Sequence, residues 1–296
     1  MTSRVFMFRE RLLTAVLGTA QFLPSRLALS TWFWHRLGYW PKLNPPRTFN
    51  EKILYRKLYD RNESFGVLCD KLAVRDFVRD RVGDMYLSVV FQVVSDPAEF
   101  DLDALPESFA LKANHGWAQH ILVHNKREFS LDDHIAQMKE WLTHHHGQKR
   151  WAREWAYSQV KPKLYAEEFL RGEGGAPPWD YKFYVFGGRV VYVHVDIDRF
   201  GCWQRCFYDR DWQTLEILGK VRLGEPRPRP ARFDEMISVA EALGRDLDFV
   251  RVDLYELPDA GIKFGEMTIY PSAGVGRFAS REWDFRFGSH WNQSVQ

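Results

Sequence analysis

The feature that most constrains the fold is a pair of strand-like segments within residues 249–276. They are separated by Pro-Asp-Ala-Gly at 258–261, a composition that favours a turn, so we expect a hairpin. Because side chains alternate across a strand, Asp253 should lie on the face opposite the apolar residues beside it. Glu266 and Thr268 should share a face of the second strand. A closed hairpin would therefore bring an aspartate and a glutamate together.

This pair of carboxylates has two interpretations. Asp253 and Glu266 could supply the hard oxygen ligands that Mg²⁺ prefers, and Mg²⁺ in proteins commonly accompanies phosphate groups. They could equally be two exposed carboxylates on the solvated face of a sheet. The sequence of the hairpin is compatible with both a metal site and a solvated face.

Composition narrows the class of protein. The 296 residues suffice for a large catalytic unit. Apolar residues make up 45% and charged residues 27%, which is typical of a globular chain and excludes a disordered one. The net charge of +2 gives no reason to expect a nucleic-acid partner. Three cysteines, Cys69, Cys202 and Cys206, provide neither a disulfide framework nor a zinc-ligand set, which suits a reducing cytoplasm.

Two segments raise the questions of a membrane and of a metal. The apolar run Leu12–Leu23 is shorter than the roughly 20 residues that cross a bilayer. It predicts a packed N-terminal helix, with an amphipathic helix on a membrane surface as the alternative. His144, His145 and His146 are consecutive, and consecutive helix residues do not share a face. We therefore interpret the three histidines as a solvated helix end.

Helical and strand-like patterns divide the chain into three parts. Residues 1–84 are predominantly helical: a capping-box pattern at 48–51 opens one helix, and Asp70–Arg81 is expected to form another. Short strand patterns dominate residues 85–175. Residues 176–296 contain further strands, one amphipathic helix and the hairpin. This order predicts an α+β fold with an N-terminal helical region.

A junction between a strand and a loop at Lys112 could hold a polyphosphate. Lysine at the end of a strand, followed by the small and polar residues 113–116, combines a point charge with accessible backbone N–H donors. The Walker pattern G-x-x-x-x-G-K-[ST] is absent from the sequence. An ordinary strand end is the alternative.

Two more segments carry weaker signals for a nucleotide. The strand edge at Tyr165–Leu170 could present backbone groups to adenine while a glutamate binds the ribose hydroxyls; an exposed edge is the alternative. Asp180 and Lys182 fall on one face of a strand. They are either a surface ion pair or a site in which Lys182 is a second phosphate cation.

The order of these segments is more informative than any one of them. A lysine loop, a Glu-Glu strand, an Asp-x-Lys strand, and Arg-x-Asp and Glu-x-Thr on a hairpin follow one another. With this order the chain resembles the TupA-like ATP-grasp family, which is linked to bacterial surface polysaccharide synthesis. The segments that carry the resemblance are Thr48–Lys52, Asp70–Arg75, Leu105–Gly116, Asp180–Phe183 and the hairpin.

The resemblance implies an ATP-grasp fold in which two α+β lobes, residues 85–175 and 176–296, hold ATP between them. Lysines and a mobile loop in the first lobe would contact phosphate, the strand edge at 167–170 would contact adenine, and Glu173 would contact ribose. The residues that the resemblance assigns to ATP are Lys71, Lys112, Asn114, His115, Gly116, Glu167, Glu168, Phe169, Leu170, Glu173 and Lys182.

The resemblance also implies a magnesium site on the hairpin. Asp253 and Glu266 match two ligands of the family, and Thr268 stands where asparagine is common. A threonine hydroxyl can also ligate a hard cation. Arg251 matches a basic position that steadies the acyl-phosphate and the tetrahedral intermediate. Arg251 and Lys112 are therefore the predicted catalytic residues.

The implied reaction joins a carboxylate to an amine. The carboxylate attacks the γ-phosphate of ATP, and the amine then displaces phosphate to give an amide. The partners would be a sugar uronate or amino acid and an amine, on a surface glycan or its precursor, in the cytoplasm or at the inner face of the membrane. Arg277, which follows the hairpin, could clamp a substrate carboxylate or be a surface arginine.

Two other functional classes remain open. A glycosyltransferase would use a D-x-D metal motif, and Asp196-Ile197-Asp198 and Asp101-Leu102-Asp103 have that form. Two such matches are also expected by chance among this many aspartates. A non-catalytic scaffold with a degenerate nucleotide site is the other alternative. The threonine at position 268 is its best support.

Overall fold

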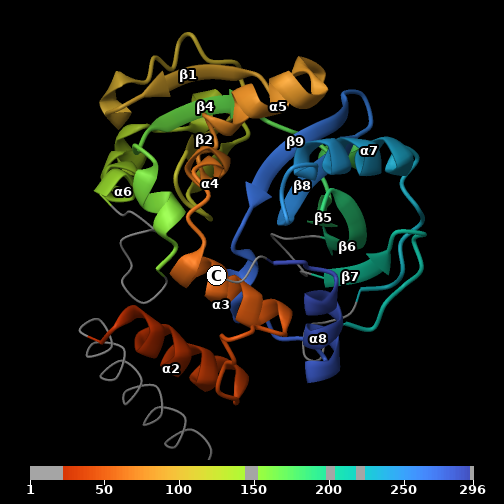
Figure 1. Ribbon diagram of the computed structural model, residues 1–296. Helices are drawn as coiled ribbons and strands as arrows, with labels where there is room; N and C mark the ends of the chain where they lie inside the picture. The colour runs from red at the N-terminus through yellow and green to blue at the C-terminus, as the bar shows by residue number, and fades with distance from the viewer. Residues whose placement is uncertain (1–22, 144–152, 198–203, 218–223, 294–296) are drawn as a thin grey trace, which may run out of the picture.

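The computed structural model describes residues 23–143, 153–197, 204–217 and 224–293. Two antiparallel sheets form its centre, a four-stranded one at the top of Figure 1 and a five-stranded one beside it. The first has the order β1-β4-β2-β3 and the second β7-β6-β5-β8-β9. The strands are β1 (Val90–Val94), β2 (Phe109–Ala113), β3 (His120–Val123), β4 (Leu164–Glu168), β5 (Asp180–Phe186), β6 (Arg189–Ile197), β7 (Gln204–Asp209), β8 (Phe249–Leu257) and β9 (Gly261–Thr268).

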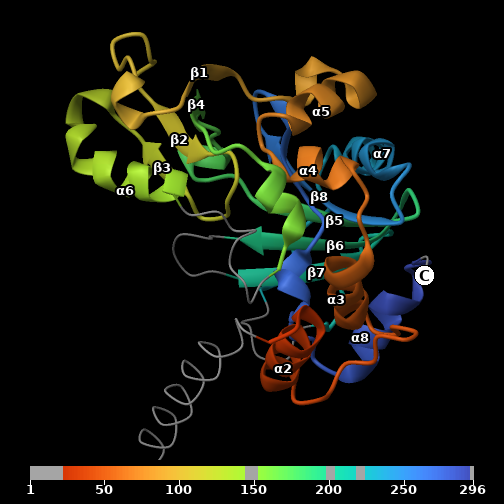
Figure 2. The same ribbon diagram turned by 60° about the vertical axis from the view of Figure 1, so that its left-hand side comes forward.

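The helices surround the two sheets, as Figures 1 and 2 show from two directions. Met138 and Trp141 of one helix pack into the core of the four-stranded sheet, while a separate, larger core joins the five-stranded sheet to the helices beside it. The α-helices are α2 (Ser25–Leu37), α3 (Phe49–Tyr59), α4 (Ser64–Cys69), α5 (Val74–Val82), α6 (Asp132–Thr143), α7 (Phe233–Gly244) and α8 (Arg281–Ser289). None of the described helices combines the length and apolar character needed to cross a membrane.

Helix α3 ties the N-terminal region to the five-stranded sheet. The predicted capping box is present, because Thr48 accepts from the backbone of Glu51 while the Glu51 carboxylate accepts from the backbone of Thr48. Arg56 of α3 is fully buried and donates to the carbonyl oxygen of Phe249, the first residue of β8, at 2.9 Å. The same helix contacts α8 and the short turn Pro271–Gly274 after β9. Helix α3 therefore contacts both ends of the hairpin that the sequence singled out.

The hairpin β8–β9 forms as predicted. Val250, Val252 and Leu254 are fully buried on one face of β8, and Asp253 lies directly opposite Glu266 on the other. The register shifts just after Asp253, next to Gly265. A Cβ at this glycine would lie 2.9 Å from the ring of Tyr255, so the absence of a side chain permits the shift.

The structure differs from the sequence prediction at one strand and at one helix start. Strand β7 was not predicted, because Cys206, Phe207 and Tyr208 are buried one after another and leave no alternation to detect. Lys71 lies in a turn before α5 rather than inside a helix, because Asp70 accepts from the backbone N–H of Leu72 at 2.9 Å. Residues 12–22 of the apolar run, the three consecutive histidines, Cys202 and Asp198 lie outside the described residues.

Candidate active site

A cleft lies between the two sheets and draws its lining from both. The four-stranded sheet contributes Lys112 and Glu167, and the five-stranded sheet contributes Asp253, Tyr255 and Glu266. The connection from β4 to β5 adds Phe169 and Leu170 to the lining. Polar and charged groups thus meet an aromatic and aliphatic wall in one concave space, as in small-molecule sites.

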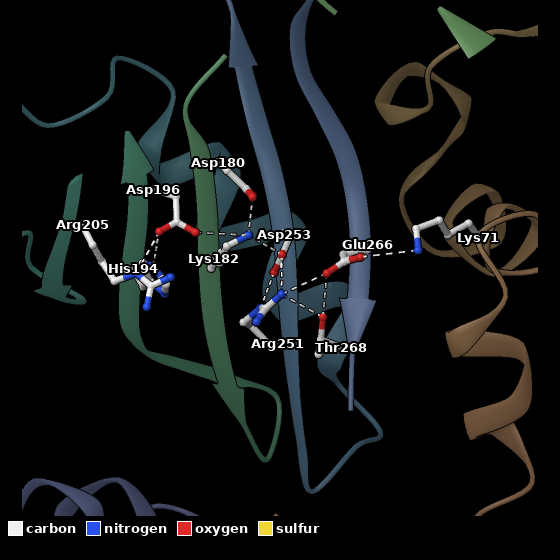
Figure 3. A network of polar contacts seen from close by, with 10 residues as sticks. All are labelled: Lys71, Asp180, Lys182, His194, Asp196, Arg205, Arg251, Asp253, Glu266 and Thr268. Atoms are coloured by element: carbon white, nitrogen blue, oxygen red, sulfur yellow. Dashed lines mark hydrogen bonds and ion pairs between the residues drawn. The ribbon is translucent and has the colours of Figure 1, made fainter. Parts of the chain in front are cut away.

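Ionisable groups form a row across the five-stranded sheet, at right angles to its strands (Figure 3). The register places Lys182 of β5 opposite His194 of β6 on one side and opposite Asp253 of β8 on the other. Asp253 in turn lies opposite Glu266 of β9. Four neighbouring strands therefore present these side chains on one face, as the pleat of a sheet requires.

Arg251 joins the two carboxylates of the hairpin. Its Nε donates to Oδ1 of Asp253 at 2.6 Å and its Nη2 to Oδ2 of the same residue at 2.7 Å. The Nη2 nitrogen also lies 3.0 Å from Glu266 Oε1 and 3.0 Å from the hydroxyl of Thr268. The Thr268 hydroxyl donates to the same Glu266 oxygen at 3.0 Å. One guanidinium thus fixes the position of three predicted site residues.

Lys182 is buried among aspartates on the same face. Its Nζ donates to Asp253 Oδ2 at 2.7 Å and contacts Asp180, and it lies 3.9 Å from Asp196. Burial alone would lower the pKa of Lys182, but Asp180 and Asp253 raise it above its ordinary value. Lys182 is therefore charged. In this structure it holds a hairpin carboxylate and lies outside the lining of the cleft.

Opposing effects set the charge of the two hairpin carboxyls. Burial raises the pKa of Asp253, and Arg251 and Lys182 oppose that rise by keeping cations against both of its oxygens. Burial would also raise the pKa of Glu266, but Lys71 and Arg251 lower it to about 2. Glu266 keeps its negative charge at any pH near neutrality, and its side chain is 34% exposed toward the cleft.

The hairpin fits a magnesium ion that is shared with phosphate. Asp253 and Glu266 offer carboxylate oxygens, and Thr268 offers a hydroxyl beside them. Among the described residues no group of three or more His, Cys, Asp or Glu side chains could hold a metal by itself. Mg²⁺ is commonly bound through one or two carboxylates and completed by phosphate and water. The donor set therefore suits Mg²⁺ that arrives with a nucleotide.

Two lysines face the hairpin from the first part of the chain. Lys71 Nζ donates to the carbonyl oxygen of Gly116 at 2.6 Å and lies 3.8 Å from Glu266 Oε2. Lys112 forms an ion pair with Glu167, and both line the cleft. With side chains 21% and 29% exposed, Lys71 and Lys112 can reach a ligand in the cleft.

The predicted adenine segment also lines the cleft. Glu167, Glu168, Phe169 and Leu170 are all part of the wall. Strand β4 lies between β1 and β2, so its backbone is paired on both sides and it is not the strand edge that the sequence predicted. Glu168 Oε2 accepts from the backbone N–H of Val89 at 3.1 Å, which holds the end of β4 against the start of β1. The Phe169 ring packs against the ring of His124, with 4.8 Å between centroids. An apolar surface is thus held at the end of β4.

Seven predicted residues lie outside the lining of the cleft. Lys182, Arg251 and Thr268 contact lining residues from the five-stranded sheet, and Asn114, His115, Glu173 and Arg277 lie elsewhere. Asn114 and His115 are buried, at 1% and 0% exposure. Asn114 bonds to Asp70, to the carbonyl oxygen of Lys161 and to the backbone of Lys163, and His115 bonds to the carbonyl oxygen of Trp141. Glu173 and Arg277 are exposed. Arg277 donates to the carbonyl oxygen of Arg36 at 3.1 Å, so the structure gives no support to a carboxylate clamp there.

Sequence reasoning missed several residues of the cleft. Asp180 was noted only as the neighbour of Lys182, yet it lines the cleft. Arg75 donates to Ser88 Oγ at 3.4 Å, and Ser88 Oγ donates to Glu167 Oε2 at 3.0 Å. This chain supports the carboxylate that pairs with Lys112. The one signal in the sequence was the spacing of Arg75 four residues after Lys71, which gave no hint of Ser88.

Two sheets face each other across a cleft, with lysines on one side and a carboxylate pair on the other, which is the arrangement that the ATP-grasp fold predicts. The chain belongs to the TupA-like ATP-grasp family, whose sequence model matches residues 51–292. The fold and the family that the sequence predicted are thereby confirmed. None of the curated proteins matches the sequence of the chain.

Solved structures of ATP-grasp enzymes resemble the chain at low identity. D-alanine–D-alanine ligase from Bacillus anthracis, complexed with ATP, is 12% identical with a TM-score of 0.40, over 69% of this chain and 54% of that one. N5-carboxyaminoimidazole synthase from Aspergillus clavatus is 13% identical with a TM-score of 0.42, over 70% and 46%. The chain spans about half the length of these proteins. Likeness at this level extends to neither substrate nor mechanism.

Proposed function

We propose that the protein is an ATP- and Mg²⁺-dependent ligase that joins a carboxylate to an amine through an acyl-phosphate. The observation that carries the proposal is the carboxylate pair Asp253–Glu266, which is bridged by Arg251 and faces Lys71 across the cleft. The two carboxylates suit the Mg²⁺ ion that accompanies ATP, and the cations around them suit the phosphoryl group. The acid is a uronate or an amino acid, and the product belongs to a bacterial surface polysaccharide or its precursor.

The residues divide the work of the proposed reaction. A carboxylate oxygen of the acid attacks the γ-phosphorus of ATP, the bond from phosphorus to the bridging oxygen breaks, and ADP leaves. Asp253 and Glu266 would hold Mg²⁺, with Thr268 beside them, and the ion would neutralise charge on the phosphates. Lys71 and Lys112 would hold phosphate oxygens from the facing side. The amine nitrogen then attacks the acyl carbon, phosphate leaves, and the nitrogen loses a proton to give the amide.

Arg251 is the proposed stabiliser of the charged intermediates. It is 12% exposed and already donates to Asp253, Glu266 and Thr268, so it needs little reorganisation when negative charge develops beside it. Its guanidinium stays protonated, because Asp253 raises its pKa well above the ordinary value against the effect of burial.

The glycosyltransferase alternative has less support from the geometry. Asp196 of one D-x-D pattern is buried in β6, where it binds Arg205 at 2.8 Å and His194 at 2.8 Å. Asp101 of the other accepts from the backbone of Asp103, as expected for a turn. Each of these two aspartates thus has a structural role.

An assay of product release tests the ligase against both alternatives. Full-length protein with ATP, Mg²⁺, pooled uronates and amino acids, and pooled amines should release ADP and phosphate only when acid and amine are both present. Turnover of a nucleotide-sugar without use of ATP would support a glycosyltransferase. Tight ATP binding without turnover of any pair would support a scaffold.

A further inference from the structure

The surface formed by α2, the turn after it and the start of α8 combines exposed aromatic and basic side chains. Leu27, Trp34, Trp40 and Phe285 are 43%, 52%, 53% and 38% exposed. Exposed cations of these elements include Arg36, Lys42, Arg47, Arg277 and Arg281. We call these nine residues the basic aromatic surface. It lies away from the cleft between the sheets, and none of its residues lines that cleft.

Contacts between the elements join the start of α8 and the segment before it to the end of α2. Arg277 donates to the carbonyl oxygen of Arg36, which joins the segment before α8 to the end of α2. The guanidinium of Arg281 lies 4.1 Å from the ring centroid of Tyr39 and 5.2 Å from that of Phe285. Figures 1 and 2 both place α2 and α8 beside α3, at the end of the molecule away from the four-stranded sheet.

The acidic residues of this region are almost all turned inward. The sequence has no aspartate or glutamate between Glu10 and Glu51. Glu51 is fully buried in the cap of α3, and Asp284 is buried and accepts from Asn50 and Tyr39. Glu282 is the acidic side chain that stays exposed in α8. A chain with a net charge of only +2 thus has a strongly basic patch here.

We propose that the basic aromatic surface docks the protein on a membrane that contains anionic lipids. Tryptophan and phenylalanine favour the boundary between headgroups and acyl chains, and nearby arginines and lysines are attracted to anionic headgroups. Charge complementarity is local and acts within about 10 Å, so a small net charge of the whole chain does not weaken it. This site is distinct from the apolar run Leu12–Leu23 that the sequence suggested.

Docking in this way would orient the active-site cleft. Because α2 and α8 lie at the end opposite the four-stranded sheet, the lobe that would carry the lysine loop points away from the bilayer (Figure 1). ATP could then enter from solvent while a lipid-linked acceptor approached from the membrane side. The docking proposal does not depend on the proposed ligase activity, because vesicle binding is measured without turnover.

Vesicle sedimentation with the full chain tests the proposal. We expect binding to vesicles of equal parts phosphatidylcholine and phosphatidylglycerol, and no binding to phosphatidylcholine alone. The double variants Trp34→Ala with Trp40→Ala and Arg277→Glu with Arg281→Glu should each lower the binding constant about tenfold or more. Binding should also weaken as salt is added. Competition by free glycerol phosphate would overturn a lipid-surface site.

Matched controls come from the other end of the molecule. Arg127→Glu changes an arginine that is 83% exposed, and Met85→Ala removes an apolar side chain that is 68% exposed; both should bind as the wild type does. Wild-type binding by both double variants would assign the membrane contact to another segment and overturn the proposal. If the double variants instead differ from the wild type in oligomeric state, measured by sedimentation velocity, the surface binds a second copy of the chain, and the membrane proposal is overturned. If either double variant fails to fold, the single changes Arg36→Gln and Lys42→Gln carry the same test.

Discussion

Arg251 and Asp253 lie two residues apart on β8 and face each other through two parallel hydrogen bonds, of 2.6 Å and 2.7 Å. Such a bidentate pair is strong and geometrically specific. Because Asp253 is 2% exposed and also accepts from Lys182, its charge is balanced before any metal or nucleotide binds. The proposed metal ligand is therefore preorganised by its neighbours, and its loss should affect both stability and activity.

Asp253→Asn and Glu266→Gln should separate these two effects. Both variants should lose turnover, because each removes a proposed ligand of Mg²⁺. Asp253→Asn should also cost about 3 kcal/mol of unfolding free energy, because it leaves two buried cations short of a partner. Glu266→Gln should cost less, because its side chain is 34% exposed. ADP release and urea unfolding measure the two quantities. Full turnover in both variants would place the metal elsewhere.

Thr268→Val tests whether the hydroxyl at this position supports the metal. The change keeps the shape of the side chain and removes the group that bonds to Glu266 and Arg251. We expect the Mg²⁺ concentration for half-maximal activity to rise about tenfold, as for other residues that orient a metal ligand. Thr268→Ser keeps the hydroxyl and should restore the wild-type value. An unchanged Mg²⁺ dependence in Thr268→Val would leave the hydroxyl without a role at the metal.

Lys112→Ala should weaken ATP binding with little effect on the fold. Lys112 is 29% exposed at the cleft and pairs with Glu167, so its charge is available to phosphate. Loss of one charge-assisted contact, about 1.5–3 kcal/mol, corresponds to about 10–100-fold in affinity. Calorimetric titration with ATP measures the change. Lys139→Ala, at a lysine 55% exposed on α6, is the matched control and should bind ATP normally.

Local patterns made the hairpin and the start of α3 predictable. Alternation on β8 set Val250 and Val252 apart from Asp253, and the buried and polar faces agree with it. The capping box predicted the start of α3 because its two hydrogen bonds are made within four residues. These features depend on contacts close in sequence, which a sequence displays directly.

Contacts far apart in sequence were not predictable in the same way. Ser88 supports Glu167, and Asp284 binds Asn50, across 79 and 234 residues. Lys182 was predicted as a phosphate contact because the sequence could not show that β8 would place Asp253 against it. The predicted loop residue Asn114 similarly has buried partners that only the tertiary fold brings to it.

Asn114→Ala should therefore act on stability rather than on nucleotide binding. The change removes bonds of 2.9 Å to Asp70, 3.0 Å to the carbonyl oxygen of Lys161 and 2.8 Å to the backbone of Lys163. Buried groups left without partners should lower the unfolding free energy by about 2–4 kcal/mol. ATP affinity, measured at a temperature where the variant is folded, should stay the same. A large loss of affinity at unchanged stability would instead support the sequence prediction that Asn114 contacts ATP.

His194 should make the stability of the protein depend on pH. Its Nε2 lies 2.8 Å from Asp196, and its Nδ1 is buried with no hydrogen-bond partner among the described residues. Burial and the nearby Arg205 lower its pKa from 6.5 to about 3. The unfolded chain therefore takes up a proton on this residue below about pH 6.5 while the folded chain does not, so stability falls as the pH falls from 6.5 toward 3.

The imidazole should account for about 2 kcal/mol of lost stability between pH 7 and pH 5, from a difference of about 1.36 kcal/mol per pH unit. His194→Gln keeps a donor for Asp196 and cannot titrate. Between pH 7 and pH 5 the variant should therefore lose about 2 kcal/mol less unfolding free energy than the wild type. His290→Gln is the control at a more exposed histidine, whose pKa is also lowered by burial, and it should remove a smaller part of the slope. Urea unfolding of the three proteins at both pH values measures the slopes. Equal slopes in wild type and His194→Gln would mean that His194 is protonated in the folded protein or that another group sets the pH dependence.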